Sequence, residues 1–213
     1  DPSLEVLLGV GIDGETCEVL KYGLEIDRCT FYENTANRGG ALYLGPEGHS
    51  SAAEMCNSIF YDNEATGDGD DEGGGAIYLN DESFLLAVNC LIHDNLADKG
   101  GAVFIDPDND SMTAPDIHIF RHCTIALNEC TDAADGAGIH MLASGTGDCA
   151  RVEVFNSIIF GNFASTGPAL DMFYAGGGIP FVVEASDFGT ASTTIDVSAS
   201  TNISRRRSIV DWS

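Results

Sequence analysis

Basic residues are scarce in this 213-residue chain, which has 9 Lys and Arg against 34 Asp and Glu and a net charge of −25. Binding to nucleic acid or to an anionic membrane surface depends on Lys and Arg that neutralise phosphates, so this balance argues against both partners. An acidic surface instead favours solubility, cations and basic partners. The hydrophobic fraction of 44% still excludes a disordered chain.

Long apolar runs are also missing. The longest, such as residues 7–12, are far too short to span a bilayer, so we expect no membrane span. No window keeps a helical period over three turns, and no signal peptide is visible. A first residue other than methionine indicates a mature product or an excised segment.

The chain does contain an internal repeat, in which two motifs recur in five copies. The first motif ends in an asparagine, at Asn34, Asn63, Asn95, Asn128 and Asn162. The second is rich in glycine and alternates apolar residues, at positions 39–44, 74–79, 100–105, 136–141 and 167–172. The asparagines lie 29, 32, 33 and 34 residues apart. Such spacing is the signature of a repeat architecture.

Each copy holds about three short alternating or apolar runs bounded by Gly, Asn, Asp and Ser, which predict strands without a crossover helix. A propeller or sandwich would need hairpin signals. A coil that returns above its own start instead places like residues over like residues, about 4.8 Å apart. We predict an all-β solenoid of about five full coils over residues 1–189, with clear repeats over 24–172. We expect residues 190–213 to form a separate Ser/Thr-rich strand or tail.

Equivalent positions predict columns of stacked side chains. The asparagines are expected to stack at a tight turn, donating to one neighbour, accepting from the other and adopting a left-handed backbone. A second column consists of small residues: Cys29, Ser58, Cys90, Cys123 and Ser157. Seven cysteines are too few for a disulfide scaffold, so we interpret the cysteines of this column as core thiols. Cys90 and Cys123 could form a disulfide if geometry allows, but Cys130 and Cys149, which lie off the column, are the better candidates.

The columns resemble those of a right-handed parallel β-helix of the pectate-lyase-like superfamily, and more narrowly the repeats named for polymorphic outer-membrane proteins. The two marks of these repeats, Phe-x-x-Asn and Gly-Gly-Ala-Ile, occur here as residues 31–34 and 39–42, and again as 60–63 and 74–77. In later copies Ile replaces Phe and the glycine motif decays. The resemblance implies the fold. For function it implies surface adhesins, secreted structural proteins, or enzymes that act on polysaccharides.

Aromatic residues mark two candidate contact stripes. Tyr43, Tyr78 and Phe104 lie between two apolar columns, in line with His140 and Asp171, so this column is expected to face outward. Its rings could stack on sugars, pack against a partner chain, or only stabilise one another. Tyr32, Tyr61 and His93 form a shorter stripe with the same alternatives.

Carboxylates suggest one metal site and no assigned catalytic residue. Asp106, Asp108 and Asp110 alternate on one short loop, a pattern that suits calcium, with a solvated acidic loop as the alternative. A glycoside hydrolase needs two carboxyls across a cleft. Glu33, Asp62 and Asp94 form an outward acidic column, which we interpret as a solvated flank.

Basic residues gather only near the end of the chain, at Arg205, Arg206 and Arg207, close to the single tryptophan, Trp212. The natural partner of this triplet is the acidic body of another copy, and head-to-tail stacking of solenoid ends would build a filament. We therefore expect a non-catalytic structural or adhesive protein, extracellular or at the cell surface. Its expected partners are itself or another surface protein, with a polysaccharide as a further ligand. The alternatives are a β-helix lyase or glycoside hydrolase, or a glycan- or calcium-binding module.

Overall fold

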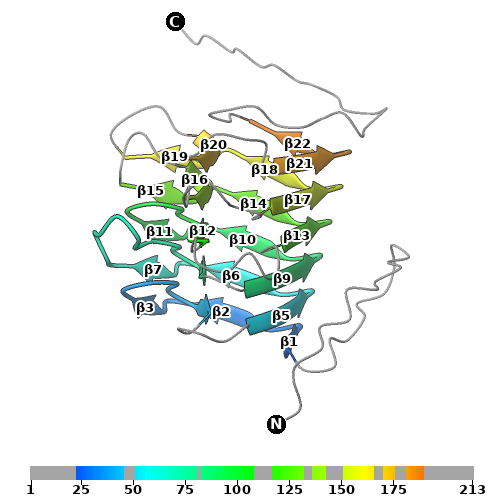
Figure 1. The fold of residues 1–213 in the computed structure, drawn as a ribbon, viewed down its shortest axis with the longest axis horizontal. Helices are drawn as coiled ribbons and strands as arrows, with labels where there is room; N and C mark the ends of the chain where they lie inside the picture. Colours follow the sequence, from blue (N-terminus) through cyan, green and yellow to red (C-terminus); the bar gives the residue numbers. More distant parts are fainter. Residues whose placement is uncertain are drawn as a thin grey trace, which may run out of the picture.

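The computed structural model describes residues 23–45, 51–80, 83–107, 117–131, 136–142, 151–165, 170–175 and 181–189. These residues form short parallel strands, wound in coils that stack along one axis (Figure 1). The described ranges contain no helix, and therefore none long and apolar enough to cross a membrane. The predicted parallel β-solenoid is confirmed.

Four parallel sheets, A to D, run along the axis. Sheet A holds β1 (Leu24–Asp27), β5 (Ser51–Cys56), β9 (Ser83–Val88), β13 (Ile117–Arg121), β17 (Arg151–Phe155) and β21 (Phe181–Glu184). Sheet B holds β2 (Thr30–Tyr32), β6 (Ile59–Tyr61), β10 (Leu91–His93), β14 (Thr124–Ala126), β18 (Ile158–Phe160) and β22 (Asp187–Phe188). Sheet C holds β3 (Thr35–Ala36), β7 (Glu64–Ala65), β11 (Leu96–Ala97), β15 (Glu129–Cys130) and β19 (Phe163–Ala164). Sheet D holds β4 (Leu42–Leu44), β8 (Ile77–Leu79), β12 (Val103–Ile105), β16 (Gly136–Met141) and β20 (Leu170–Tyr174).

Each complete coil therefore has four strands rather than about three. The additional strand is the two-residue strand of sheet C, which follows each asparagine immediately. It carries no apolar alternation of its own, so the sequence pattern did not mark it. The described strands form five successive sets of four, from β1–β4 to β17–β20, followed by β21 and β22.

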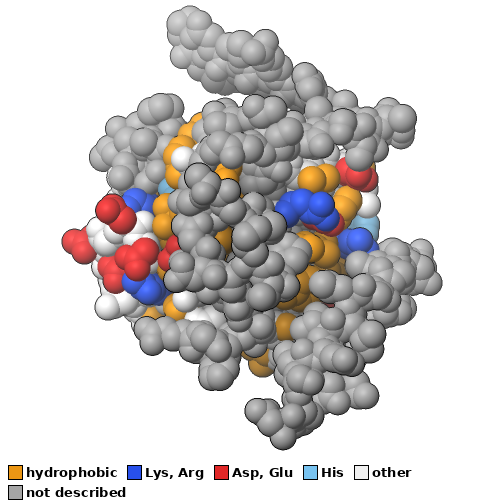
Figure 2. Space-filling view, in the orientation of Figure 1, with side chains coloured by type: hydrophobic (Ala, Val, Ile, Leu, Met, Phe, Trp, Pro, Cys, Tyr) orange, Lys and Arg blue, Asp and Glu red, His pale blue; other side chains and the backbone are white. Residues whose placement is uncertain are grey.

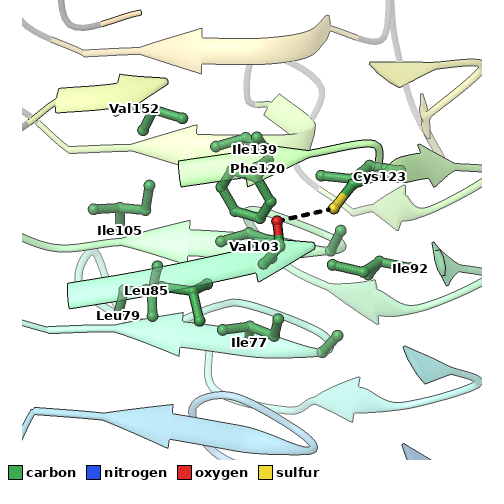
Figure 3. Packing of buried hydrophobic residues seen from close by; sticks show 14 of the residues in the cluster. Ile77, Leu79, Leu85, Ile92, Val103, Ile105, Phe120, Cys123, Ile139 and Val152 are labelled. Carbon is green, nitrogen blue, oxygen red and sulfur yellow. Dashed lines mark hydrogen bonds between the residues drawn. The ribbon is translucent and has the colours of Figure 1, made fainter. Parts of the chain in front are cut away.

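The interior is a set of apolar columns in strict register. Phe31, Phe60, Ile92, Ile125 and Ile159 are successive partners in sheet B. In sheet D, Ile77 pairs with Val103 and Val103 with Ile139, and all three are fully buried. Figure 3 shows side chains of sheets A, B and D meeting in this interior. Burying each such aliphatic side chain stabilises the fold by about 1.5–3 kcal/mol.

The last coil departs from the predicted register. The repeat places Leu170 opposite Ile139 and Asp171 opposite His140, but Ile139 pairs with Met172 and His140 pairs with Phe173. The register shifts between Gly136 and Ile139, where β16 has one residue more than β20. Such an irregularity absorbs an extra residue in one strand. The alignment of the two glycine motifs is therefore wrong for this coil, and Asp171 does not belong to the aromatic column.

Among the described cysteines, four are free thiols and one, Cys56, is disulfide-bonded. Cys90 and Cys123 are buried free thiols on neighbouring coils, so they are not joined here. Cys130 is a buried thiol, so the expectation of a disulfide at this residue is wrong. Cys56 is disulfide-bonded, and its partner lies outside the described residues, as does Cys149.

Candidate functional site: the outer face of sheets B and C

Left-handed residues form the corner between sheets B and C. Positive φ angles occur at Glu33, Asp62, Asp94, Leu127 and Gly161, each directly before an asparagine. The five asparagines that follow them do not have positive φ, so the prediction of a left-handed repeat asparagine is wrong by one residue. The left-handed residue turns the chain so that the following asparagine points inward and its own side chain points out.

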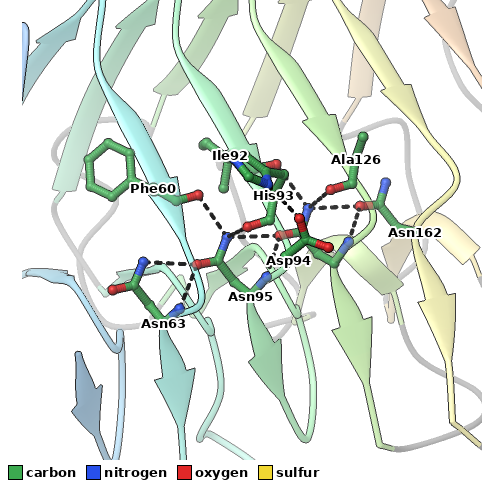
Figure 4. Close-up of polar contacts among 9 residues, drawn as sticks. Phe60, Asn63, Ile92, His93, Asp94, Asn95, Ala126 and Asn162 are labelled. Atoms are coloured by element: carbon green, nitrogen blue, oxygen red, sulfur yellow. Dashed lines mark hydrogen bonds and ion pairs between the residues drawn. The ribbon is translucent and has the colours of Figure 1, made fainter. Parts of the chain in front are cut away.

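The asparagines form a continuous hydrogen-bonded ladder (Figure 4). The Nδ2 of each one donates to the Oδ1 of the asparagine on the next coil, at 2.8–2.9 Å from Asn34 through to Asn162. The backbone N–H of each donor residue uses the same Oδ1 atom, at 3.0–3.3 Å. From Asn63 onward the side chains are buried. The ladder therefore satisfies a row of polar groups inside an apolar core.

Asp171 ends this ladder, a role that the repeat did not predict. The backbone N–H and Nδ2 of Asn162 donate to its Oδ1 atom, at 3.0 and 2.8 Å. Asp171 is only 3% exposed. Gly189 leaves it room, because a Cβ atom there would lie 2.2 Å from Asp171 Oδ2. The sequence contains one sign that the ladder ends here, because no asparagine occurs 29–34 residues after Asn162.

The first aromatic column is stacked but mostly buried. Ring centroids from Tyr43 through Tyr78, Phe104 and His140 to Phe173 lie 4.8–5.4 Å apart. Tyr43 is 42% exposed, whereas Tyr78 and Phe104 are fully buried. This corrects the expectation that Tyr78 and Phe104 present a surface to glycans or partners. They point away from the interior, as predicted, but the loop over residues 66–73 contacts them.

Hydrogen bonds hold this loop against the column. The single hydroxyl hydrogen of Tyr78 is shared between two acceptors, the Asp71 carbonyl oxygen and Asp106 Oδ2, which lie 2.9 and 2.8 Å from the hydroxyl oxygen. Burial and the neighbouring Asp106 carboxylate raise the pKa of Tyr78. Arg38 lies over the Tyr78 ring and forms an ion pair with Asp71.

The predicted calcium loop is described only at its first carboxylate. Asp106 accepts the Tyr78 hydrogen bond, while Asp108 and Asp110 lie outside the described residues. Asp70, in the acidic loop after β7, lies 3.6 Å from the Nζ atom of Lys99 on the next coil. Figure 2 shows acidic and basic side chains together over this loop. Across the described ranges, no group of three or more His, Cys, Asp or Glu side chains could hold a metal ion. Calcium binding at 106–110 stays a prediction.

The second aromatic stripe lies on the exposed outer face of sheet B. Tyr32 stacks on Tyr61 and Tyr61 on His93, with centroids 5.3 and 5.4 Å apart and planes within 8° of parallel. Because the rings cover one another's faces, the stripe presents ring edges and hydroxyl groups to solvent. Sugars stack on ring faces, and in this stripe the stacking leaves uncovered only the two end faces, one of Tyr32 and one of His93. The geometry therefore favours a protein partner over a stacked glycan.

Large apolar side chains continue this face on the later coils. Four of them are 43–54% exposed, and we call them the apolar patch: Leu127, Ile158, Phe160 and Phe163. On the first three coils the corner beside the stripe carries Glu33, Asp62 and Asp94, the acidic column, and all three are exposed. Stripe, patch and acidic column together form what we call the contact face. Arg205, Arg206, Arg207 and Trp212 lie outside the described residues.

The parallel coils, the four sheets and the inward asparagine ladder show that the protein is a β-solenoid. Residues 9–195 match the family described as the right handed beta helix region, and the chain belongs to this family. Searches among curated proteins and among solved structures found no match to the chain.

Proposed function

We propose that this chain is a non-catalytic structural or adhesive protein of the cell surface or extracellular space, and that it associates with further copies through the contact face. The exposed apolar patch beside the aromatic stripe carries the proposal. Contiguous exposed apolar groups with a polar border are typical of protein interaction sites.

The distribution of shifted titratable groups supports a scaffold rather than an enzyme. Burial lowers the pKa of His118 and of His140 to about 3, and both rings lie inside the molecule. A catalytic acid or base must reach a substrate. The described histidines with shifted pKa values are out of such reach, and the exposed carboxylates of the acidic column line an open corner.

The disulfide at Cys56 supports a location outside the cytosol. Disulfides persist in oxidising compartments and are rare where thiols are kept reduced. Alkylation of the unreduced native protein, followed by mass spectrometry, tests this: Cys56 is expected to escape labelling until a reductant is added.

Bead clustering tests the contact face. Beads coated with the wild-type chain are expected to aggregate, and beads coated with the double variant Ile158→Ser, Phe160→Ser are expected to stay dispersed. Leu24→Ser is the matched control, because Leu24 is as exposed as Ile158, at 48%, but lies on sheet A. Clustering that the double variant leaves unchanged would overturn the proposal. Release of reducing or unsaturated ends from a polysaccharide panel would favour the enzyme alternative instead.

A further inference from the structure

We propose that the basic segment of one copy, residues 205–212, binds the contact face of the next copy and links the copies head to tail. This inference rests on the proposed function and names the partner of the contact face. The segment is Arg-Arg-Arg-Ser-Ile-Val-Asp-Trp.

The distribution of ion pairs identifies the segment as the partner of the contact face. The basic residues of the described ranges are engaged locally: Arg28 with Asp27, Arg38 with Asp71, Lys99 with Asp70, Arg151 with Glu153, and Arg121 over the Phe155 ring. Glu33 and Asp62 of the acidic column form no ion pair with any described residue. The remaining bases are Lys21 and the three adjacent arginines, which are the one cluster of positive charge in the sequence. The acidic column and the arginine triplet are therefore complementary.

The contact face and the basic segment also carry their charged and apolar groups in the same order. From the first coil to the last, the contact face is acidic at Glu33, Asp62 and Asp94 and then apolar at Leu127 and Phe160. The segment is basic first and then apolar, at Ile209, Val210 and Trp212. Three coil spacings from the coil of Asp62 to that of Phe160 cover about 14 Å, which about five extended residues also span. The arginines and the apolar residues can thus meet their counterparts together.

Chain direction favours a second copy. Within one molecule the segment has to run back along the solenoid from Gly189 and then reverse, because its basic end must lie at the first coils. A copy stacked beyond the last coil needs no reversal. The 15 residues 190–204 reach up to about 50 Å when extended, and the first to the sixth coil span about 24 Å.

The asparagine ladder disfavours a simpler junction of coil on coil. Each asparagine donates toward the following coil, yet Asp171 at the last position is a carboxylate that accepts from Asn162. On the first coil, the Asn34 Oδ1 atom also accepts no hydrogen bond from the described residues. Two acceptors would therefore face each other at such a junction. A segment that docks on the next copy avoids this mismatch, and as a heterologous contact it gives open-ended chains.

Charge reversal on the full-length protein tests the inference by sedimentation velocity at low ionic strength. The face-reversed variant carries Glu33→Lys, Asp62→Lys and Asp94→Lys, and the segment-reversed variant carries Arg205→Glu, Arg206→Glu and Arg207→Glu. Each variant alone is expected to require an about tenfold higher concentration for assembly. An equimolar mixture is expected to assemble like the wild type, because each reversed face then meets a segment of opposite charge.

Circular dichroism and urea unfolding establish that both variants are folded, since lysine is less suited than aspartate to the left-handed corner. A mixture of folded variants that stays monomeric would overturn the inference, as would a segment-reversed variant that assembles like the wild type. A compact monomer at every wild-type concentration would show binding within one chain and overturn it too. If the segment-reversed beads cluster normally while Ile158→Ser, Phe160→Ser beads do not, the partner is wrong and the contact face stands.

Discussion

The two corners that flank sheet B have the same backbone geometry but different side chains. At each corner a residue with positive φ precedes one that points into the solenoid. Between sheets B and C the inward residue is asparagine on each of the five described coils that include this corner. Between sheets A and B it is cysteine or serine: Cys29, Ser58, Cys90, Cys123, Ser157 and Ser186.

Hydrogen bonding differs accordingly. At the A–B corner a serine hydroxyl accepts the N–H of the preceding coil, as from Cys123 to Ser157 at 3.0 Å, and donates to the carbonyl two residues earlier, at 2.8 Å. A thiol donates to such a carbonyl, as from Cys90 to Val88 at 3.4 Å, but is a weak acceptor. An amide donates and accepts equally well along the axis. The comparison shows that the asparagine corner has a strong acceptor on each described coil after the first. At the A–B corner a weak sulfur acceptor receives the N–H of the preceding coil wherever cysteine occurs, as from Ser58 to Cys90.

The largest expected effect comes from breaking the continuous corner. Asn95→Leu removes the Oδ1 atom that accepts two hydrogen bonds from Asn63 and leaves buried donors unpaired. We expect a loss of about 3–5 kcal/mol in the free energy of unfolding, measured with urea. Asn80→Ala is the control, since its amide bonds Tyr43 at the surface, and it should cost less than about 1 kcal/mol. Equal losses would show that the ladder has no special weight.

His118 is a buried polar residue that lies at neither corner, and it makes the stability of the fold depend on pH. It lies on sheet A between Leu85 and Val152, and neither ring nitrogen has a hydrogen-bond partner among the described residues. Its pKa is lowered to about 3, so the unfolded chain takes up the proton first, and stability is lost as the pH falls below about 6.5. From pH 7 to pH 4.5 the loss is about 2–3 kcal/mol.

His118→Val removes this contribution, so its urea midpoint should fall less over the same pH range than that of the wild type. His140, whose pKa is also about 3, is retained in both proteins and cancels. Parallel pH profiles for variant and wild type would contradict the assignment to His118.

Asp171 tests how the continuous corner ends. Asp171→Ala leaves the N–H and Nδ2 of Asn162 without their acceptor, and we expect a loss of about 2 kcal/mol in unfolding free energy. Asp171→Asn keeps an Oδ1 atom and should lose less than half of that. If asparagine is as damaging as alanine, the acceptor role is not the one that matters.

The smallest expected effect comes from strengthening the A–B corner. Cys90→Ser replaces the weak sulfur acceptor of the Ser58 N–H by a hydroxyl, as Ser58 itself accepts from Cys29 at 3.1 Å. We expect a gain of up to about 1 kcal/mol over the wild type in urea unfolding, against a loss of similar size for Cys90→Ala. A serine variant no more stable than the alanine variant would show that the corner gains nothing from a stronger acceptor.

Periodic features of this molecule were predictable and singular ones were not. The apolar columns and the positions of the asparagines follow from repetition, because parallel coils place equivalent residues in register. The burial of Tyr78 depends on the path of the 66–73 loop, whose length no other copy of the repeat shares. Asp171 reaches Asn162 across nine residues instead of a full period, after a strand irregularity shifted its register. No repeat signal could place either one.

The one-way ladder has a consequence for how the chain is made. Each asparagine depends on the coil synthesised after it. The last folded coil of a nascent chain therefore ends on an asparagine whose backbone N–H and one Nδ2 hydrogen still lack their acceptor, while Nδ2 already donates to a carbonyl of the preceding coil, as from Asn95 to Phe60. That condition lasts until Asp171 is available to Asn162. The order of translation and the direction of the ladder thus coincide, and a chain cut short before residue 171 lacks the acceptor for the backbone N–H and one Nδ2 hydrogen of Asn162.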